Sequence, residues 1–219
     1  MTTSGFYPIT LVDKTREYDG VHTLRFASPA PISFVPGQYV HLLAPASPPG
    51  PENVRHLSIA SIPEEGFLRF TVDFNSTSEY KKKLAALKPG GLAHLFKVKG
   101  EFVLGETLPT QVVFLAGGLG ITPIRALLRQ IVHRGLEVDW RLMHVARESF
   151  LYASEIESWG GLQARVRRPQ AGALVASWAA HCPSATYYVS GSSRFVAGIT
   201  ELLAACGVGH DALQVENFR

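Results

Sequence analysis

Residues 111–123 read Gln-Val-Val-Phe-Leu-Ala-Gly-Gly-Leu-Gly-Ile-Thr-Pro, and this stretch decides the fold. Its first part, Gln111 to Ala116, is a continuous apolar run of the kind found in parallel sheets, where strands are buried on both faces. Three glycines follow it at once: Gly117, Gly118 and Gly120. Thr122 is placed to cap the next helix, and Pro123 suits the first turn of that helix, where a missing N–H costs nothing. The stretch therefore predicts a buried strand, a tight turn and a helix.

The glycine-rich turn predicts a phosphate-binding site. Glycines let the backbone turn tightly and let a pyrophosphate approach without a Cβ in the way. The amides and the dipole at the start of the helix favour an anion there. The usual third glycine of a dinucleotide fingerprint is absent, and Pro123 stands near its place. A merely tight turn is the alternative, but the strand before it and the helix after it favour the phosphate site.

The residues one strand later bear on the choice of nucleotide. Where an acidic residue would bind the ribose of NAD, the sequence reads His144-Val145-Ala146-Arg147. Arg147 could meet the 2′-phosphate of NADP, although Glu148 follows at once and makes the preference slight. A solvated surface charge is an equal alternative for Arg147. NADPH and NADH therefore both stay open as electron donors.

The first half of the chain has a different rhythm, which changes near residue 106. Short β-rich runs are separated there by Pro-, Gly- and Ser-rich turns, and this pattern predicts a small antiparallel six-stranded β-barrel. One helix is expected at Glu79–Leu87. The expected strands are Ile9–Val12, Val21–Phe26, Gln38–Leu43, His56–Ala60, Phe67–Phe74 and Leu92–Val98.

After Pro109 strands and helices alternate, which predicts an α/β domain with an open, doubly wound parallel sheet. Beyond the first strand, the expected elements are a helix at Pro123–Arg134, a strand at Val138–Val145, a helix at Tyr152–Trp159, a strand and a helix within Ala164–Ala180, a strand at Thr186–Val189, a helix at Phe195–Cys206 and a strand at Leu213–Glu216. We therefore expect two domains, residues 1–106 and residues 107–219.

Composition excludes several classes of protein. With 46% hydrophobic and 18% charged residues the chain is an ordinary globular protein, and no apolar run approaches the roughly 18 residues of a membrane span. Without a signal-peptide pattern, a cytoplasmic address is expected. The two cysteines, Cys182 and Cys206, are too few for an iron–sulfur cluster, and the eight histidines lie at no metal-ligand spacing, so no metal is expected. The net charge of +3 does not indicate nucleic-acid binding, but it could favour an acidic protein partner.

Several motifs, in order along the whole chain, resemble those of the ferredoxin–NADP reductase superfamily. Arg55-His56-Leu57-Ser58 resembles its flavin motif, Arg-x-aromatic-Ser, and the turn at 117–123 resembles its nicotinamide-nucleotide turn. The other matching segments are Pro36-Gly37-Gln38-Tyr39-Val40, Ser78 to Leu84, Lys88-Pro89-Gly90, Gly100-Glu101-Phe102, Val189-Ser190-Gly191-Ser192 and Val215-Glu216-Asn217-Phe218. The last two stand where the family has Cys-Gly-Pro and a terminal Glu-x-aromatic.

The resemblance implies a flavin bound by the first domain. Arg55 would pair with the flavin pyrophosphate, a bidentate contact that suits arginine, and Ser58 would place its hydroxyl near the flavin N5. His56 and Leu57 belong to the same cofactor-binding motif. Further donors to the phosphates would come from the start of the helix, from Ser76, Thr77 and Ser78. A pyrophosphate favours FAD over FMN.

For the second domain, the resemblance implies the nicotinamide end of the site. Thr122 would lie close to the nicotinamide, and Gly191 would belong to the cofactor-binding segment. Glu216 and Phe218 would border the flavin ring, Phe218 by stacking on it. Ser58, Ser190 and Glu216 are then the expected catalytic residues. Two departures could slow hydride transfer without removing the pocket: Leu57 replaces the family's aromatic residue, and Ser190 replaces its cysteine.

The implied activity is hydride transfer from NAD(P)H to FAD N5, followed by electron transfer to a separate protein carrier such as ferredoxin or flavodoxin, or to an oxygenase. Lys81 to Lys83 and the arginines at 165, 167 and 168 could steer an acidic carrier, although most charge runs are solvated faces. Two alternatives remain. One is a reductase of free flavin or ferric chelates, and the other is a non-catalytic flavin-binding module of a larger complex.

Overall fold

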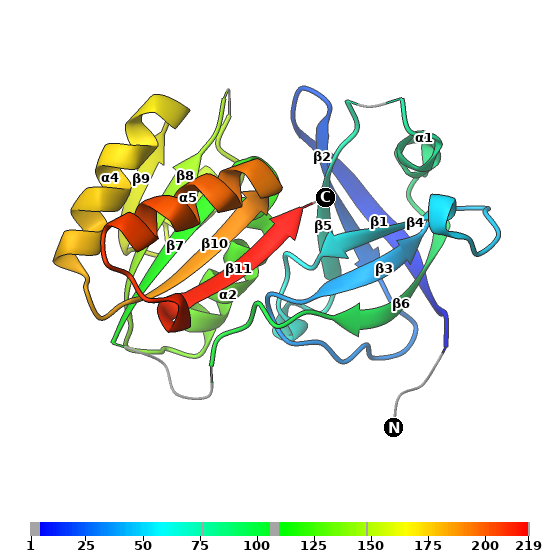
Figure 1. Ribbon diagram of the computed structural model, residues 1–219. Coiled ribbons are helices and arrows are strands. Elements are labelled where there is room, and N and C mark those ends of the chain that lie inside the picture. Colours follow the sequence, from blue (N-terminus) through cyan, green and yellow to red (C-terminus); the bar gives the residue numbers. More distant parts are fainter. Residues whose placement is uncertain (1–4, 76, 106–109, 148, 219) are drawn as a thin grey trace. The chain divides into compact units, whose positions relative to one another are not determined.

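A computed structural model describes residues 5–75, 77–105, 110–147 and 149–218 (Figure 1). The chain divides into two compact units, Met1–Val103 and Leu104–Arg219. The boundary expected between residues 106 and 107 lies outside the described residues.

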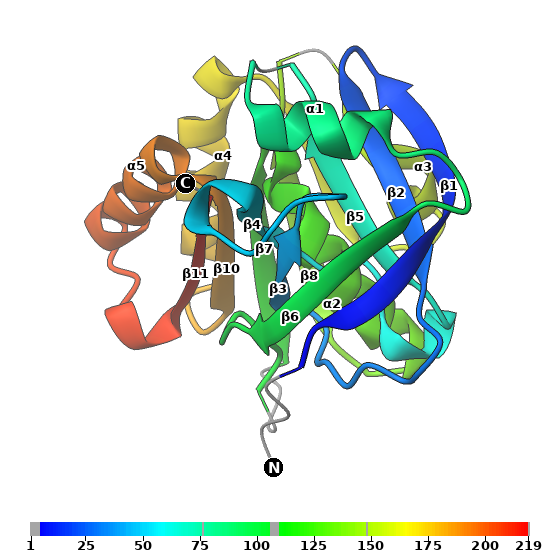
Figure 2. The same cartoon turned by 90° about the vertical axis from the view of Figure 1, so that its right-hand side faces the viewer.

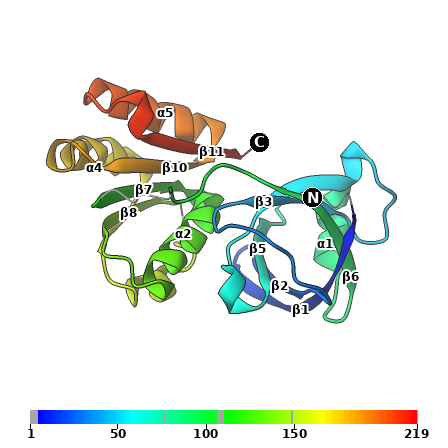
Figure 3. The same cartoon turned by 90° about the horizontal axis from the view of Figure 1, so that it is seen from below.

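The N-terminal unit is a six-stranded antiparallel sheet with strand order β4-β3-β6-β1-β2-β5. Its strands are β1 (Tyr7–Tyr18), β2 (Val21–Ala27), β3 (Tyr39–Leu43), β4 (Val54–Ser58), β5 (Leu68–Asp73) and β6 (Leu92–Lys99). Just after β4, Ala60 donates its N–H to the carbonyl of Arg69 on β5, so the two end strands meet and the sheet curls into a barrel (Figure 3). The predicted antiparallel six-stranded barrel is confirmed.

The interior of this barrel follows from the alternation of side chains along its strands. Fully buried residues recur at every second position, as in Ile9 and Leu11 of β1 and Val40 and Leu42 of β3. Helix α1 (Glu79–Ala86) lies against the barrel (Figure 2). It adds two more core side chains, Tyr80 and Leu84. Two short 3₁₀ helices, η1 (Pro51–Asn53) and η2 (Pro63–Glu65), lie in the connections on either side of β4.

The strand that carries the flavin motif starts and ends two residues earlier than predicted. It was expected at His56–Ala60 and is observed at Val54–Ser58. Ser58 pairs with Tyr39, the first residue of β3. Beyond this pair the chain leaves β3 and turns toward β5 through the Ala60 hydrogen bond, and the regular ladder therefore ends at Ser58.

The C-terminal unit is a five-stranded parallel sheet with strand order β11-β10-β7-β8-β9. Helices α4 and α5 cover one face and α2 covers the other (Figure 3), which confirms the predicted doubly wound α/β sheet. The elements in chain order are β7 (Gln111–Gly117), η3 (Gly118–Gly120), α2 (Ile121–His133), β8 (Asp139–Val145), α3 (Ala153–Glu157), β9 (Leu162–Val166), α4 (Arg168–His181), β10 (Thr186–Ser192), α5 (Ser193–Ala205), η4 (His210–Ala212) and β11 (Leu213–Phe218).

The order of the strands defines a switch point between β7 and β10. From β7 the chain moves outward to β8 and β9, then returns to place β10 and β11 on the other side of β7. In open α/β sheets ligands bind outside the carboxyl ends of the strands at such a point, because the connections diverge there and leave a crevice.

The prediction that Thr122 caps helix α2 is wrong. The helix begins at Ile121, two residues before the predicted Pro123, and Gly120 is its N-cap residue. The Thr122 hydroxyl instead donates to the carbonyl of Leu119 at 2.8 Å. The 3₁₀ turn at Gly118–Gly120 runs directly into the helix, so Thr122 already lies in the first helical turn. Pro123 lies in that turn too, as expected.

Candidate functional site

The glycine-rich turn after β7 packs directly against the end of β10. A Cβ on Gly120 would lie 2.0 Å from the carbonyl oxygen of Ser190, and a Cβ on Gly117 would lie 2.5 Å from the ring of Phe195. Gly118 has φ +55°, a conformation that favours glycine. The three glycines are therefore required by space or by backbone conformation. They form a cradle at the switch point, with main chain at its surface in place of side chains.

Two further residues complete this cradle. A Cβ on Gly191 would lie 3.0 Å from the Gly117 carbonyl oxygen and 2.9 Å from Cδ1 of the Phe195 ring. Phe195 lies in the first turn of α5, whose N-cap Ser192 accepts a hydrogen bond from its amide. Sequence analysis missed the contact of Phe195 with the turn, because nothing in the local sequence links α5 to Gly117.

Ser190 brings a polar side chain to the same edge of the sheet. In the parallel register it lies between Ala116 of β7 and Glu216 of β11. Its side chain is fully buried, and its Oγ has no hydrogen-bond partner among the described residues. A buried hydroxyl left unpaired costs about 1–3 kcal/mol, so such an atom fits a site completed by a ligand.

Glu216 and Phe218 lie at the carboxyl end of β11. Glu216 pairs with Ser190, and Phe218 pairs with Ser192 at the end of the ladder. Burial raises the pKa of the Glu216 carboxyl to about 7, because the charged form loses hydration there. The structure therefore brings Ser190, Gly191, Glu216 and the glycine turn together at the carboxyl edge of one sheet.

A buried histidine supports the turn from the next strand. His144 of β8 lies with its Nε2 3.0 Å from the carbonyl oxygen of Gly118. Burial lowers the pKa of His144 to about 4; the hydrogen bond to Gly118 opposes this shift, and Arg165 adds to it. The imidazole is therefore neutral at neutral pH. The sequence analysis passed over His144 and considered only its neighbour Arg147.

Arg147 follows β8 with its side chain exposed. The backbone here is held by Arg167, whose guanidinium donates to the carbonyls of Ala146, at 3.1 Å, and of Arg147 itself. The Arg167 guanidinium also lies 5.5 Å from the centre of the Phe150 ring. The Arg147 side chain therefore extends from a segment at the carboxyl end of β8 whose backbone is held by hydrogen bonds from Arg167. The neighbouring Glu148 lies outside the described residues.

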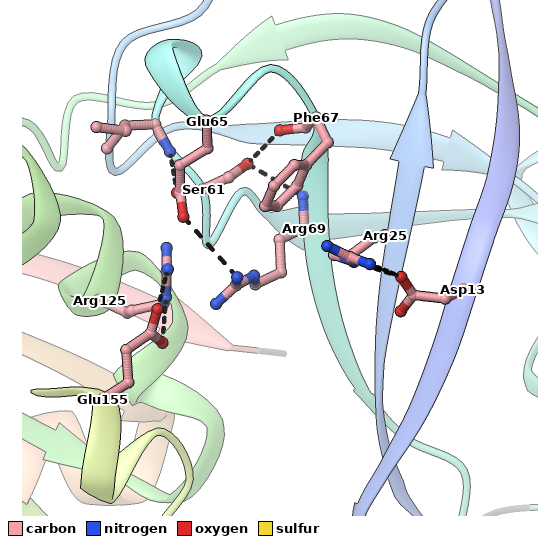
Figure 4. Close-up of polar contacts among 9 residues, drawn as sticks. Asp13, Arg25, Ser61, Glu65, Phe67, Arg69, Arg125 and Glu155 are labelled. Atoms are coloured by element: carbon pink, nitrogen blue, oxygen red, sulfur yellow. Dashed lines mark hydrogen bonds and ion pairs between the residues drawn. The ribbon is translucent and has the colours of Figure 1, made fainter.

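A buried ion pair ties the helix that begins at the turn to α3. The Arg125 side chain of α2 is fully buried, and its Nε and Nη2 donate to the two carboxylate oxygens of Glu155 at 2.9 and 2.5 Å (Figure 4). The rings of Tyr152 and Trp159 each lie 5.6 Å from the guanidinium. The sequence analysis missed this pair, because the two residues are 30 positions apart.

In the N-terminal unit, Arg55 and helix α1 lie together. The Arg55 guanidinium lies 5.2 Å from the centre of the Tyr80 ring and donates to the carbonyl of Val54 at 2.7 Å. Tyr80 follows Ser78, the N-cap of α1, by two residues. The strand with the flavin motif and the start of α1 therefore meet, which sequence spacing did not indicate. Thr77 directly precedes the cap, and Ser76 lies outside the described residues.

The remaining residues of the flavin motif divide between the two faces of β4. Leu57 packs against the barrel core opposite Val40. His56 lies on the other face, with its ring 4.1 Å from that of His41 and 5.1 Å from that of Tyr39. Ser58, half-buried, ends the strand on the same face as His56. The structure therefore does not bring His56 and Arg55 together.

Ser61, three residues beyond the motif, has a structural role. Its hydroxyl donates to the carbonyl of Phe67 at 2.8 Å and accepts from the amide of Arg69 at 3.0 Å (Figure 4). The guanidinium groups of Arg25 and Arg69 lie 5.2 and 5.4 Å from the centre of the Phe67 ring. These contacts fix the start of β5 within the barrel.

The residues that the structure describes contain no group of three or more His, Cys, Asp or Glu side chains arranged to hold a metal ion. In the same part of the chain no helix is long and apolar enough to cross a membrane. Cys182 and Cys206 are both free thiols.

Solved structures share this fold over nearly the whole chain. A mutant of the ferredoxin-NADP+ reductase of Plasmodium falciparum in complex with 2'P-AMP has a TM-score of 0.81 at 15% identity, covering 100% of this chain and 99% of that one. The ferredoxin reductase in carbazole 1,9a-dioxygenase has a TM-score of 0.81 at 18% identity, covering 98% and 70%. At these identities the likeness shows the fold, which is that of the FAD- and NAD(P)-binding reductases.

Relatives found by sequence agree with the fold, although no protein-family model matches the chain. Ferredoxin--NADP reductase B of Sorangium cellulosum is 33% identical over 141 residues, 61% of this chain and 55% of that protein. A flavohemoprotein of Halalkalibacterium halodurans is 28% identical over 132 residues, 55% and 31%. The toluate 1,2-dioxygenase electron transfer component of Pseudomonas putida is 30% identical over 123 residues, 56% and 35%.

In fold and in sequence, the chain is similar to the FAD- and NAD(P)-binding reductases. The chain has the fold of the ferredoxin–NADP reductases, and one of its sequence relatives carries that name. It spans about a third of the length of the flavohemoprotein and about half of that of the reductase.

Proposed function

We propose that this chain transfers hydride between NAD(P)H and the N5 atom of a bound FAD, and that its electrons pass to a separate protein carrier. The observation that carries the proposal is the cradle at the switch point. There Gly117 and Gly120 let the turn pack closely against Phe195 and Ser190, the Cβ position of Gly118 is open, and the adjacent Ser190 Oγ is buried without a partner among the described residues. A neutral, small hydroxyl and exposed main chain fit a dinucleotide.

The proposed FAD site lies where β4 and the start of α1 meet. The Arg55 guanidinium, seated on the Tyr80 ring, holds the pyrophosphate, and the start of α1 at Thr77 and Ser78 adds hydrogen-bond donors. In this proposal the hydroxyl of Ser58 hydrogen-bonds at N5 and His56 lies on the same face of β4, while Leu57 packs against the barrel core on the other face. Bound FAD supplies the ring that accepts the hydride and releases electrons. We favour FAD over FMN because the Arg55 site is suited to a pyrophosphate.

In the nucleotide site, the turn and the start of α2 bind the pyrophosphate through backbone amides. The buried Thr122 and Pro123 shape the first turn of α2. Ser190, Gly191 and Glu216 border the reacting end, and Phe218 covers the flavin ring when nicotinamide is absent. The exposed Arg147 is the residue we assign to a 2′-phosphate, which makes NADPH the preferred donor.

The electron acceptor that we propose is a separate, acidic protein. Two relatives carry the names of a ferredoxin–NADP reductase and of a dioxygenase electron transfer component, which supports a ferredoxin, a flavodoxin or an oxygenase as the electron acceptor. Net charge of +3 favours an acidic carrier. Of the basic run in α1, however, Lys82 pairs with Glu79 and Lys83 donates to Ser47, so part of that charge is already paired.

The proposal is tested by absorbance of the purified chain loaded with FAD, before and after anaerobic addition of NADPH and, separately, of NADH. We expect a yellow protein whose flavin band bleaches, faster with NADPH. A protein that takes up no FAD, or whose bound FAD neither nucleotide reduces, contradicts the proposal. If the flavin washes off and free flavin is turned over, the chain is a reductase of free flavin instead.

Arg147→Ala tests the nucleotide preference. Loss of the Arg147 guanidinium should weaken the binding of NADPH more than that of NADH, by about tenfold or more, since charge-assisted hydrogen bonds are worth about 1.5–3 kcal/mol. Arg134→Ala, an exposed arginine at the other end of α2, is the matched control for the lost charge and should leave both affinities unchanged. Equal weakening of NADPH and NADH by Arg147→Ala would contradict the assignment of Arg147.

A further inference from the structure

We propose that His144 is a positioning residue for the nucleotide turn, and that its imidazole N–H sets the direction of the Gly118–Leu119 peptide, whose amide then faces the pyrophosphate. This inference rests on the proposed nucleotide site. It assigns a task to a buried side chain that lies on a different strand from the turn.

The position of His144 follows from the register of the sheet. On β8 it lies opposite Ala116 of β7 and Arg165 of β9, one strand away from the turn that follows β7. Its Nε2 reaches the Gly118 carbonyl oxygen at 3.0 Å. Because a carbonyl can only accept, Nε2 carries the hydrogen and donates it. The amide of Ile121 donates to the same oxygen, so two donors hold it.

The orientation of one carbonyl determines that of the next amide. In a planar trans peptide the carbonyl oxygen of residue 118 and the N–H of residue 119 point in opposite directions. With the Gly118 oxygen turned inward to His144, the Leu119 N–H is turned away from β8. If this peptide rotated by half a turn, a carbonyl oxygen would take the place of the amide and would repel a phosphate.

Because Gly118 is flexible, hydrogen bonds to its carbonyl oxygen are needed to hold the Gly118–Leu119 peptide in one direction. Gly118 is at φ +55°, and nothing lies within 4 Å of the position that its Cβ would occupy. A residue without a side chain adopts several backbone conformations at little cost, so the direction of the peptide depends on the two donors to the Gly118 oxygen, the Ile121 amide within the turn and the His144 ring outside it. The ring N–H of His144 stabilises one of these conformations. The open position beside Gly118 leaves room for a phosphate, and the hydrogen bond from His144 holds the direction of the peptide.

The surroundings of His144 make its contribution geometric rather than electrostatic. Burial lowers the pKa of its imidazole to about 4, so the ring is uncharged at neutral pH and adds no positive charge to the turn. The Phe150 ring packs edge-on at 5.4 Å between centroids and limits rotation of the imidazole. If His144 were only a hydrogen-bonded residue of the core, its substitutions would lower the stability of the protein and leave nucleotide binding unchanged.

Three variants of the full chain, loaded with FAD, separate these roles. His144→Phe keeps a ring but removes the donor. His144→Gln keeps an N–H donor. Trp140→Phe, at another buried position of β8, is the control for a general loss of stability. For each we would measure the Kd of NADPH, which has a pyrophosphate, and of 2′-phospho-AMP, which has none, together with thermal unfolding; NADH and AMP replace them if NADH is the better donor.

We expect His144→Phe to weaken NADPH binding by about tenfold or more, with 2′-phospho-AMP and FAD binding unchanged. His144→Gln should recover most of the loss, and Trp140→Phe should bind NADPH like the wild type. NADPH binding unchanged in His144→Phe, or weakened equally for both ligands, would overturn the role of His144 while the nucleotide site stands. A wild-type chain that binds no nicotinamide nucleotide would overturn the proposed function, and this inference with it.

Discussion

Glu216 stands at the end of β11, opposite Ser190 in the register of the sheet. Burial raises the pKa of its carboxyl to about 7, so the group is mostly neutral below that pH and mostly charged above it. In the proposed site, a negative charge on Glu216 beside the flavin ring would disfavour the transfer of hydride to that ring. We therefore expect the rate of FAD reduction by NADPH to fall as the pH rises through about 7.

The Glu216→Gln variant keeps the shape of the side chain and removes its titration. Its rate should stay near the low-pH value of the wild type throughout. Stopped-flow reduction over about pH 5.5–8.5, at saturating NADPH, measures this dependence. If wild type and variant share one pH profile, another group titrates and Glu216 has no part in the reaction.

His144 makes the stability of the C-terminal unit depend on pH. Its pKa is about 4 in the native chain against an ordinary 6.5. Between these values the unfolded chain binds a proton that the native chain does not, so the free energy of unfolding falls as the pH drops from 6.5 to 4 and this contribution then levels off. At about 1.4 kcal/mol per pKa unit the loss is about 3 kcal/mol.

Urea unfolding of wild type and His144→Phe at several pH values isolates this effect, since other groups titrate equally in both. The difference in unfolding free energy between the two proteins should shrink toward pH 4 as the wild type loses stability. A difference that is the same at pH 7 and pH 4 would mean that the native pKa of His144 is not lowered.

Gly120 is the residue at which the turn tolerates no side chain. In Gly120→Ala the new Cβ would lie 2.0 Å from the Ser190 carbonyl oxygen, so the turn or the end of β10 must shift. We expect loss of NADPH binding with FAD binding retained, measured by titration of each. Gly198→Ala in α5 is the control, because nothing lies within 4 Å of the added Cβ and alanine favours a helix interior by about 1 kcal/mol.

At the scale of elements, α2 and α3 are held together by Arg125 and Glu155. Glu155→Gln would remove the carboxylate that pairs with the fully buried Arg125 guanidinium, and we expect it to lower the free energy of unfolding by about 3 kcal/mol. The double change Arg125→Met with Glu155→Gln should cost less than Glu155→Gln alone, because no charge is then left buried. Chemical denaturation of the three proteins measures this, and a double variant less stable than the single one would contradict it.

The same scale explains which elements could be predicted from sequence. Except for β1, which runs to Tyr18 and not to the predicted Val12, the strands of the barrel and the helices of the second unit were placed to within a few residues, because side-chain periodicity is a local property of the chain. Boundaries were less accurate. Thr122 is a residue type that often caps helices, but the 3₁₀ turn before it leads directly into the helix, which therefore begins before Thr122. Helix α3 is shorter than its predicted range, since Tyr152, at φ +60°, lies outside it.

At the scale of the whole molecule, the two compact units should respond to different ligands. All three tryptophans, Trp140, Trp159 and Trp178, belong to the C-terminal unit, so their fluorescence reports on that unit alone. A ligand at about 100 times its Kd stabilises its site by about 2.7 kcal/mol. We expect 2′-phospho-AMP to raise the fluorescence-detected transition, and FAD to raise a separate transition seen only by circular dichroism. One coincident transition that both ligands move equally would contradict this prediction.

The sequence by itself determined the two-part architecture, the glycine-rich turn and the family resemblance. Each of these is written in local patterns: alternation at a period of two, helical spacing, and glycines between a buried strand and a helix. Such patterns act through backbone sterics and burial over a few residues, so they can be recognised without knowing which distant residue lies opposite.

The side chains that support the site could be identified only in the folded chain. Gly120 against Ser190, His144 on the Gly118 carbonyl and Arg55 on the Tyr80 ring each join residues at least 25 positions apart. The physical reason is that a hydrogen bond or a ring contact depends on distance in space, and strand order sets that distance. No local pattern in the sequence encodes that β10 returns to lie beside β7.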